Sequence, residues 1–264
     1  MLEKLGRTRD RVLDNVHQLE GRTLLDVGCG DGLIAFGALE RGAAEVVFSD
    51  ISADLLEACR ELATELGVLG RCRFLLAPAD ELSDVADSSV DAVTTRSVLI
   101  YVRRKQDAFA EFFRVLRPGG RVSVWEPINR FGSGFRTSES FWGYETSGLD
   151  AVIDKLDAVF AGLQPDDDPM LDFDERDLLE LAERAGFTEL HLELRADVEP
   201  MQPRSWQTFL HTSGNPKLPT LAEAMDRALT PAERRLLAER LAPAVEAGRG
   251  THRLALASLW AVKP

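Results

Sequence analysis

The chain has 264 residues, of which 45% are hydrophobic, and its formal net charge at pH 7 is −13. This length allows one substantial hydrophobic core and lies near the upper end of what a single domain usually holds. A chain this acidic repels phosphate backbones and anionic membrane surfaces, so we expect neither nucleic acid nor membrane as a partner.

Short apolar segments alternate with helical patterns through the first half of the chain. Val12, Val16 and Leu19 recur at helical spacing, which predicts an amphipathic first helix ending at Gly21. The next predicted elements are strand 23–27, helix 33–41, strand 45–49, helix 53–66, strand 72–76, strand 90–94, helix 107–116 and strand 121–126. Uniformly apolar strands separated by helices predict a doubly wound α/β fold with a mostly parallel sheet.

The alternation stops after residue 126 and returns later. Residues 175–185 predict a helix closed by Gly186, and residues 189–195 and 253–262 predict two more strands, which makes seven. We therefore expect a single domain over residues 1–264, with a core formed by residues 1–127, 173–195 and 251–264. The remaining segments, 128–172 and 196–250, are predicted to be helical insertions after strands five and six. Thr230 and Glu233 predict a capping box within the second.

The three cysteines, Cys29, Cys59 and Cys72, form no C-x-x-C pair and lie in segments predicted to be core. This pattern fits reduced thiols and therefore a cytoplasmic protein. The first sixteen residues are charged and lack an apolar segment, and the chain has no run of about 18 apolar residues. We expect neither a signal peptide nor a membrane span.

A glycine-rich segment follows the first predicted strand and leads directly into a helix. It reads Asp26-Val27-Gly28-Cys29-Gly30-Asp31-Gly32. Glycines allow positive φ and a close approach of the backbone to a ligand, while a helix N-terminus attracts an anion. The dinucleotide fingerprint requires a third glycine where this chain has Leu33, so an NAD-dependent enzyme is disfavoured.

Two further carboxylates come at the ends of the next strands. Asp50 ends the second strand, where it can accept hydrogen bonds from the two hydroxyls of a ribose. Asp80 follows the third strand, where it can accept a hydrogen bond from the exocyclic amine of adenine. Together with Asp26, they place acidic residues at three successive strand ends, which indicates a nucleotide-like ligand.

The order of these motifs resembles that of the class I S-adenosylmethionine-dependent methyltransferases. LLDVGCGDG resembles the family's first motif, FSDIS its second, PADEL its third and SVDAVTTRSVLIYV its fourth, and FFRVLRPGGRVSVWEP resembles the segment leading into the fifth strand. The resemblance covers residues 24–126 together with the final helix and two strands. It implies a Rossmann-like fold and transfer of a methyl group from S-adenosylmethionine to an O, N or C atom of a small molecule.

The resemblance also implies roles for individual residues of the cofactor site. Gly28, Cys29, Gly30 and Gly32 would line the methionine part, with Asp26 supporting the loop near its ammonium group. Asp50 would hold the ribose, Ile51 would pack on adenine, Ala79 and Asp80 would contact the adenine edge, and Thr95 and Arg96 would close the site near the sulfonium.

The acceptor side is less constrained by the sequence. Candidate catalytic residues are His211, Glu126 and Arg96, although methyl transfer needs a general base only for an acceptor that keeps its proton at neutral pH. For Glu126, contact with the acceptor and anchoring of a loop are equally supported alternatives. The aromatic residues of the insertions are candidates either for acceptor walls or for a small core of their own: Phe131, Phe135, Trp142, Tyr144, Trp206 and Phe209.

Other interpretations stay open at this point. The acidic residues between 166 and 175 lack an EF-hand register, so we expect a solvated loop and no metal. The chain could bind the cofactor as a regulatory protein without transferring methyl groups, or use the sulfonium for other chemistry, because a fold does not fix a function. A small-molecule acceptor is the expected partner, the insertions are expected to form a lid on its side, and a homodimer is one candidate assembly.

Overall fold

The computed structural model describes residues 2–133, 140–165, 167–213, 215 and 218–264. Its described residues divide into two compact units. Unit 1 comprises residues 1–127, 173–195 and 256–264, and unit 2 comprises residues 128–172 and 196–255.

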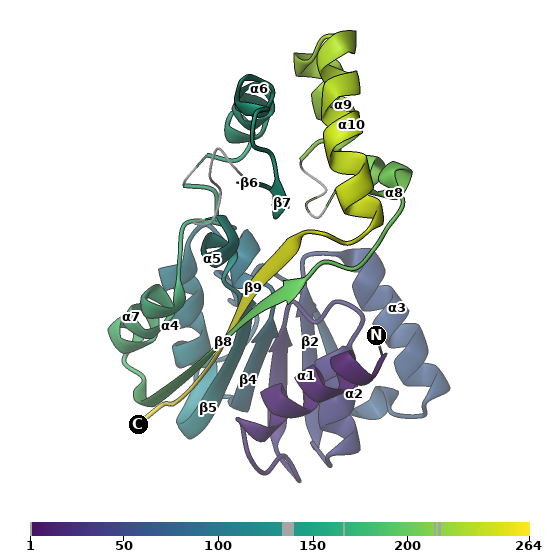
Figure 1. Ribbon diagram of the computed structural model, residues 1–264. Helices are drawn as coiled ribbons and strands as arrows, with labels where there is room; N and C mark the ends of the chain where they lie inside the picture. Colours follow the sequence, from purple (N-terminus) through teal and green to yellow (C-terminus); the bar gives the residue numbers. More distant parts are fainter. Residues whose placement is uncertain (1, 134–139, 166, 214, 216–217) are drawn as a thin grey trace. The chain divides into compact units, whose positions relative to one another are not determined.

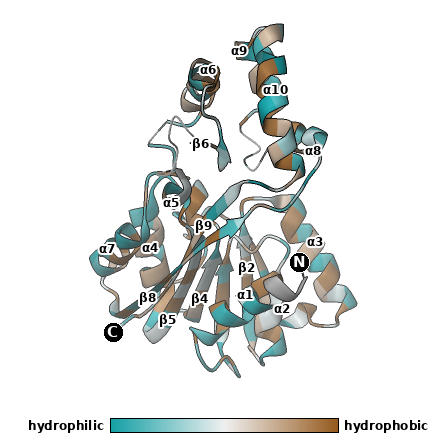
Figure 2. Cartoon of the chain, in the orientation of Figure 1, coloured by the Kyte–Doolittle hydropathy of each residue, from teal (hydrophilic) through white to brown (hydrophobic). Residues whose placement is uncertain are grey.

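Unit 1 contains a seven-stranded sheet in the order β3-β2-β1-β4-β5-β9-β8. The strands are β1 (Thr23–Val27), β2 (Glu45–Asp50), β3 (Cys72–Leu76), β4 (Val90–Arg96), β5 (Leu116–Pro127), β8 (Thr188–Pro200) and β9 (Thr251–Val262). β1 to β5 pair in parallel and β9 runs antiparallel to β5. The prediction of a doubly wound, mostly parallel sheet is therefore confirmed. The hydrophobic colouring of Figure 2 is concentrated on the central strands, as expected for a sheet buried on both faces.

Helices cover both faces of this sheet (Figure 1). Helices α1 (Leu2–Asp14), α2 (Leu33–Glu40) and α3 (Ala53–Glu65) lie on one face, and α4 (Lys105–Val115) packs with α7 (Glu175–Ala185) on the other. Short 3₁₀ turns, η1 (Leu69–Arg71) and η2 (Leu99–Tyr101), precede β3 and follow β4. The described core beside α1 and α2 includes Leu24, Val46 and Phe48, all fully buried.

The first helix is shorter than its apolar spacing predicts. α1 ends at Asp14, and His17 has a positive φ of 61°, which no helix accommodates. Val16 and Leu19 are nevertheless buried in the same core as Val12. The prediction of a helix running to Gly21 is wrong because a turn places these two side chains in the core without helical backbone.

Unit 2 consists mainly of helices. These are α5 (Asn129–Ser133), α6 (Asp150–Ala161), α8 (Trp206–His211), α9 (Leu221–Ala228) and α10 (Pro231–Glu246), together with a hairpin of β6 (Ser140–Phe141) and β7 (Tyr144–Glu145). The predicted capping box at Thr230 is present, with the Thr230 hydroxyl accepting from the Glu233 amide and the Glu233 carboxylate accepting from the Thr230 amide. Residues such as Leu156, Leu221 and Leu241 form a buried core for this unit.

Candidate functional site

The glycine-rich loop joins the carboxyl end of β1 to α2. Gly28, Gly30 and Gly32 all have positive φ, at 66°, 54° and 79°. The Gly30 amide donates to a carboxylate oxygen of Asp50 at 2.9 Å, and the other oxygen of Asp50 accepts from the Ser52 amide at 3.0 Å. Asp50 therefore fixes the loop as well as ending β2, and each of its oxygens retains a lone pair for a further donor.

The three glycines differ in what surrounds them. A methyl group on Gly28 would lie 2.2 Å from Val98 Cγ2, and one on Gly32 would lie 2.5 Å from the Phe36 ring. A methyl group on Gly30 would meet no described atom within 4 Å. Gly28 and Gly32 are thus required by packing within the protein, whereas the space beside Gly30 is open for a ligand.

Two polar side-chain atoms near this loop are buried without a hydrogen-bond partner among the described residues. They are Oδ2 of Asp26 and Oγ1 of Thr95. Oδ1 of Asp26 accepts from the Thr94 hydroxyl at 2.8 Å. Burial raises the pKa of Asp26 to about 7, although the Thr94 hydrogen bond, the charge of Arg96 and the backbone amide of Ala35 act in the opposite direction.

The residues expected around adenine lie at the ends of β2 and β3. Ile51 is 75% exposed, the largest exposure among the large hydrophobic side chains described, and therefore has a free apolar face. Ala79 is buried. Asp80 accepts from Nε of Arg104 at 2.9 Å, so its carboxylate already has an arginine partner. Arg96 lies half-buried at the end of β4.

Cys29 lies within the glycine-rich loop, and Cys59 lies against the same loop. Both thiols are buried, and Sγ of Cys59 donates to the Gly30 carbonyl at 3.4 Å. A hydrogen bond with Cys59, together with burial, raises the pKa of the Cys29 thiol. Cys29 is therefore a neutral, small side chain within the loop.

Glu126 is fully buried at the end of β5, where it holds the loop after β4. One oxygen accepts from the amides of Val98 and Leu99 at 2.8 and 3.0 Å, and the other accepts from Ile100 at 3.4 Å. Burial raises the pKa of Glu126 to about 7, against these three amides and the charge of Lys105, which lower it. Between the alternatives of loop anchor and acceptor contact, this geometry favours the anchor.

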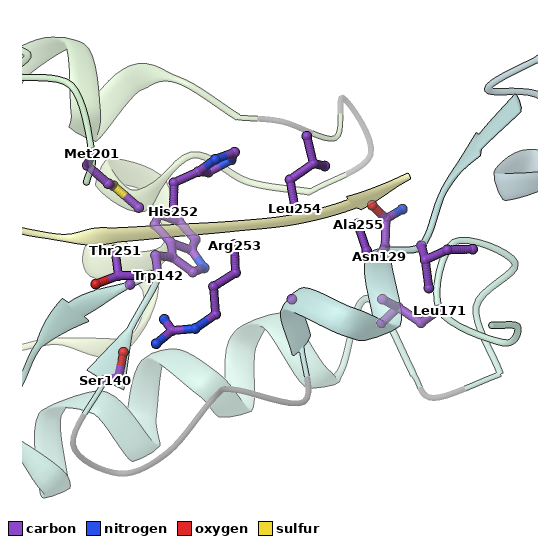
Figure 3. Close-up of a pocket in the computed structure, with 13 residues that line it drawn as sticks. Asn129, Ser140, Trp142, Leu171, Met201, Thr251, His252, Arg253, Leu254 and Ala255 are labelled. Carbon is purple, nitrogen blue, oxygen red and sulfur yellow. The ribbon is translucent and has the colours of Figure 1, made fainter. Parts of the chain in front are cut away.

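Two neighbouring cavities lie among the described residues of unit 2. The larger has a volume of about 470 Å³, and its walls include Trp142, Phe160 and Phe209. The smaller has a volume of about 360 Å³ and is shown in Figure 3. Asn129, Trp142, Leu171 and Met201 line both cavities. Both volumes lie within the range of small-molecule sites.

The aromatic candidates have different positions relative to these cavities. Trp142 and Phe209 line cavity walls, whereas Trp206 packs on Phe209 with ring centroids 5.6 Å apart and lines neither. Tyr144 is fully buried in the core of unit 2 and Phe131 is half-buried outside both walls. Phe135 lies outside the described residues.

His211 is exposed at the end of α8, and its Nδ1 lies 2.9 Å from the Gln207 carbonyl of the same helix. It is not among the wall residues of either cavity. Several wall residues were not expected from the sequence, including Phe160, Met201, Arg204 and Arg253. No sequence signal marks them, because they come from three separate segments, α6, the connection between β8 and α8, and β9, which only the folded chain brings together.

Comparisons with known proteins agree with this architecture. Residues 25–124 match the family model described as a methyltransferase domain. The ubiquinone/menaquinone biosynthesis C-methyltransferase UbiE of Stutzerimonas stutzeri is 37% identical over 126 residues, which are 46% of this chain and 49% of that protein. The ubiquinone biosynthesis O-methyltransferase of Alkalilimnicola ehrlichii is 37% identical over 121 residues, or 46% and 47% of the two chains.

The chain thus spans about half the length of the curated relatives that it matches. Among solved structures, the YcgJ protein of Bacillus subtilis aligns with a TM-score of 0.59 at 15% identity, covering 97% of this chain and 98% of that one. At that identity the likeness concerns the fold alone.

The first prediction separates the packing role of the loop glycines from ligand binding. Gly28→Ala should lower the free energy of unfolding by about 3 kcal/mol, because a methyl group there clashes with Val98 at a positive φ. Gly30→Ala should cost only about 1 kcal/mol of backbone strain. Urea denaturation measures both. Gly67→Ala is a matched control, since Gly67 also has a positive φ and no atom within 4 Å of the added methyl group. If Gly30→Ala lowered the free energy of unfolding much more than Gly67→Ala, the loop would have no open space at Gly30.

The second prediction concerns pH. The pKa of Glu126 in the folded protein is raised from 4.5 to about 7, so its protonation contributes to the free energy of unfolding. This contribution is complete below about pH 4.5 and is lost as the pH rises through 7. Glu126→Gln should therefore make the fall in stability between pH 5 and 7 shallower by up to about 1.4 kcal/mol per pH unit. Urea denaturation at several pH values tests this. The exposed Glu61→Gln variant should keep the parental slope; equal slopes for all three proteins would contradict the raised pKa.

Proposed function

We propose that this chain, which belongs to the class I S-adenosylmethionine-dependent methyltransferases, transfers a methyl group from S-adenosylmethionine to a small-molecule acceptor. The observation that carries the proposal is the open space at Gly30. It lies beside the carboxylate of Asp50, the last residue of the neighbouring strand β2. The names of the two relatives, for carbon and oxygen methylation in ubiquinone or menaquinone biosynthesis, support a small-molecule acceptor.

The residues of unit 1 fit S-adenosylmethionine. The open space at Gly30 would admit the methionine part close to the backbone, and buried Asp26 would support the loop near its ammonium group. Asp50 would accept from the ribose hydroxyls and the exposed face of Ile51 would cover the adenine ring. Asp80 would contact the adenine edge while keeping its pair with Arg104.

S-adenosylmethionine supplies an activated methyl group together with its leaving group, so the acceptor atom needs chiefly to be aligned and shielded from water. Well-oriented reactants can gain about 7–11 kcal/mol from alignment alone. Within this proposal Glu126 acts by positioning the loop of Val98, Leu99 and Ile100, and His211 has no part as a base. Arg96 remains the candidate near the sulfonium.

We also propose that unit 2 binds the acceptor in its two cavities. The aromatic walls of the larger cavity support an acceptor with an apolar body. The acidic chain supports a partner other than nucleic acid, and its three free cysteines support a reducing compartment such as the cytoplasm. Within the part of the chain that the structure describes, none of the helices has the length and apolar character to cross a bilayer.

The third prediction tests methyl transfer directly. Incubation with methyl-labelled S-adenosylmethionine and a metabolite extract should label a low-mass product, identified by mass spectrometry. Gly30→Ala should reduce the affinity for S-adenosylmethionine at least tenfold in calorimetry, since its methyl group occupies the space proposed for the ligand.

Gly67→Ala, which has the same kind of backbone strain, should bind like the parent. Label found only in protein or RNA would refute a small-molecule acceptor. Tight binding without any labelled product would instead support a regulatory protein. Gly30 is a sharper test than Asp50, because removing Asp50 also takes away the acceptor of the Gly30 amide.

The fourth prediction concerns the acceptor. With the acceptor identified by labelling, Trp142→Ala should raise its KM about tenfold and leave the KM for S-adenosylmethionine unchanged, since apolar walls contribute binding to the acceptor alone. Trp206→Ala removes the same side chain from outside the walls and serves as the matched control. Equal effects of the two variants on the acceptor KM would show that Trp142 acts only by packing.

A further inference from the structure

Two cysteines from different elements of unit 1 meet at the glycine-rich loop. Cys29 belongs to the loop itself, and Cys59 lies within α3. Their sulfur atoms approach the same carbonyl oxygen, that of Gly30, at 4.0 Å for Cys29 and 3.4 Å for Cys59. Both side chains belong to one buried cluster, in which they are 5% and 2% exposed. Because a hydrogen bond also joins the two thiols, their sulfur atoms are in contact.

The third cysteine is arranged differently. Cys72 in β3 is half-buried, and its thiol donates to the Val68 carbonyl at 3.3 Å. It therefore has a backbone partner of its own, whereas Cys29 and Cys59 share one. A direct contact between two thiols is the arrangement that a disulfide bond needs, since its Cβ atoms lie about 3.5–4.5 Å apart.

The contact also divides the two thiols into a more acidic and a less acidic one. The hydrogen bond with Cys29 lowers the pKa of the Cys59 thiol, although burial and the charges of nearby aspartates act in the opposite direction. The same hydrogen bond raises the pKa of the Cys29 thiol. Cys59 therefore ionises first while Cys29 keeps its proton. The thiolate is the form of cysteine that reacts with oxidants, so Cys59 is the nucleophile of the pair.

We propose that Cys29 and Cys59 form a reversible disulfide bond, and that this bond weakens cofactor binding at Gly30. The oxidant is a peroxide. The Cys59 thiolate attacks one peroxide oxygen, the O–O bond breaks, and a sulfenic acid and hydroxide are formed. The Cys29 thiol then attacks the sulfur of this sulfenic acid, so that the S–S bond forms and water leaves.

The reaction is balanced by one peroxide for each chain. Two electrons pass from the two sulfur atoms to the peroxide, and the two thiol protons end in the two water molecules that are formed. A dithiol reductant reverses the bond by thiol–disulfide exchange. In a reducing compartment such a bond is transient, which suits a device that responds to oxidants.

The open space at Gly30 gives a small oxidant a route toward the buried pair. A methyl group on Gly30 would meet no described atom within 4 Å, and the carbonyl of the same residue contacts both sulfur atoms. Gly30 therefore lies between the open space and the thiols. A ligand that occupies this space shields the thiols from the oxidant.

The disulfide acts on the loop because it is much shorter than the contact that it replaces. Its sulfur atoms lie about 2.05 Å apart, far closer than those of two thiols. Closing this gap draws Cys29 toward α3, and the bond removes the proton that Cys59 donates to the Gly30 carbonyl. Gly30 is the next residue of the loop, with a φ of 54°, so its position changes as well. The effect on S-adenosylmethionine rests on the proposed function, whereas the disulfide itself does not.

The test treats the reduced full chain with hydrogen peroxide. The intact mass should fall by two hydrogen atoms, and peptide mapping without reductant should join the peptide of Cys29 to that of Cys59. The affinity for S-adenosylmethionine in calorimetry should fall by about tenfold, and dithiothreitol should restore it. Saturating S-adenosylmethionine should slow formation of the bond by about tenfold, because it covers the route at Gly30.

Three variants control the interpretation. Cys59→Ala and Cys29→Ala each remove one thiol of the pair, so peroxide should leave the affinity of either variant where it was before treatment. Cys72→Ala removes the thiol outside the pair, and should form the bond and lose affinity like the parent. Circular dichroism should show a cooperative melting transition for each reduced variant.

Other outcomes would overturn the proposal. These are a bond between Cys59 and Cys72, oxidation of Cys59 to a sulfinic acid without a bond, and a bond between Cys29 and Cys59 that leaves the affinity unchanged. Failure of the proposed function gives a different result. If the reduced chain binds no S-adenosylmethionine, the effect on the cofactor is overturned with that function, while a mapped bond between Cys29 and Cys59 still establishes the oxidisable pair.

Discussion

One buried carboxylate sets the geometry on which the site of unit 1 depends. Glu126 accepts from three consecutive amides after β4, and thereby fixes the position of Val98. Val98 in turn packs so closely on the glycine-rich loop that Gly28 has no room for a methyl group. Glu126 at the end of β5 therefore fixes the segment after β4, and this segment fixes the path of the glycine-rich loop after β1. The open space at Gly30 depends on that path. A buried carboxylate of this kind is tolerated because its oxygens are satisfied by amides.

The fold of unit 1 could be predicted because its signals are local. Apolar strands such as β1 and β2 are buried along almost their full length, so composition alone marks them. The prediction fails where burial no longer follows the sequence pattern. β8 extends to Pro200, beyond the predicted residue 195, and most of its residues are exposed, so no apolar signal marks its end. α1 fails for the opposite reason, since a turn buries Val16 and Leu19 without a helix.

The residues of the candidate site also divide into those that the sequence could predict and those that it could not. Gly30, Asp50 and Asp80 could be selected from the sequence because each lies at or after the end of a strand, at a recognisable place in a motif. The role of Glu126 could not be decided, since it depends on which amides the folded chain brings to it. The cavity walls of unit 2 could be predicted only in part: Trp142 and Phe209 were candidates, whereas Phe160, Met201 and Arg253 come from separate segments without any periodic pattern.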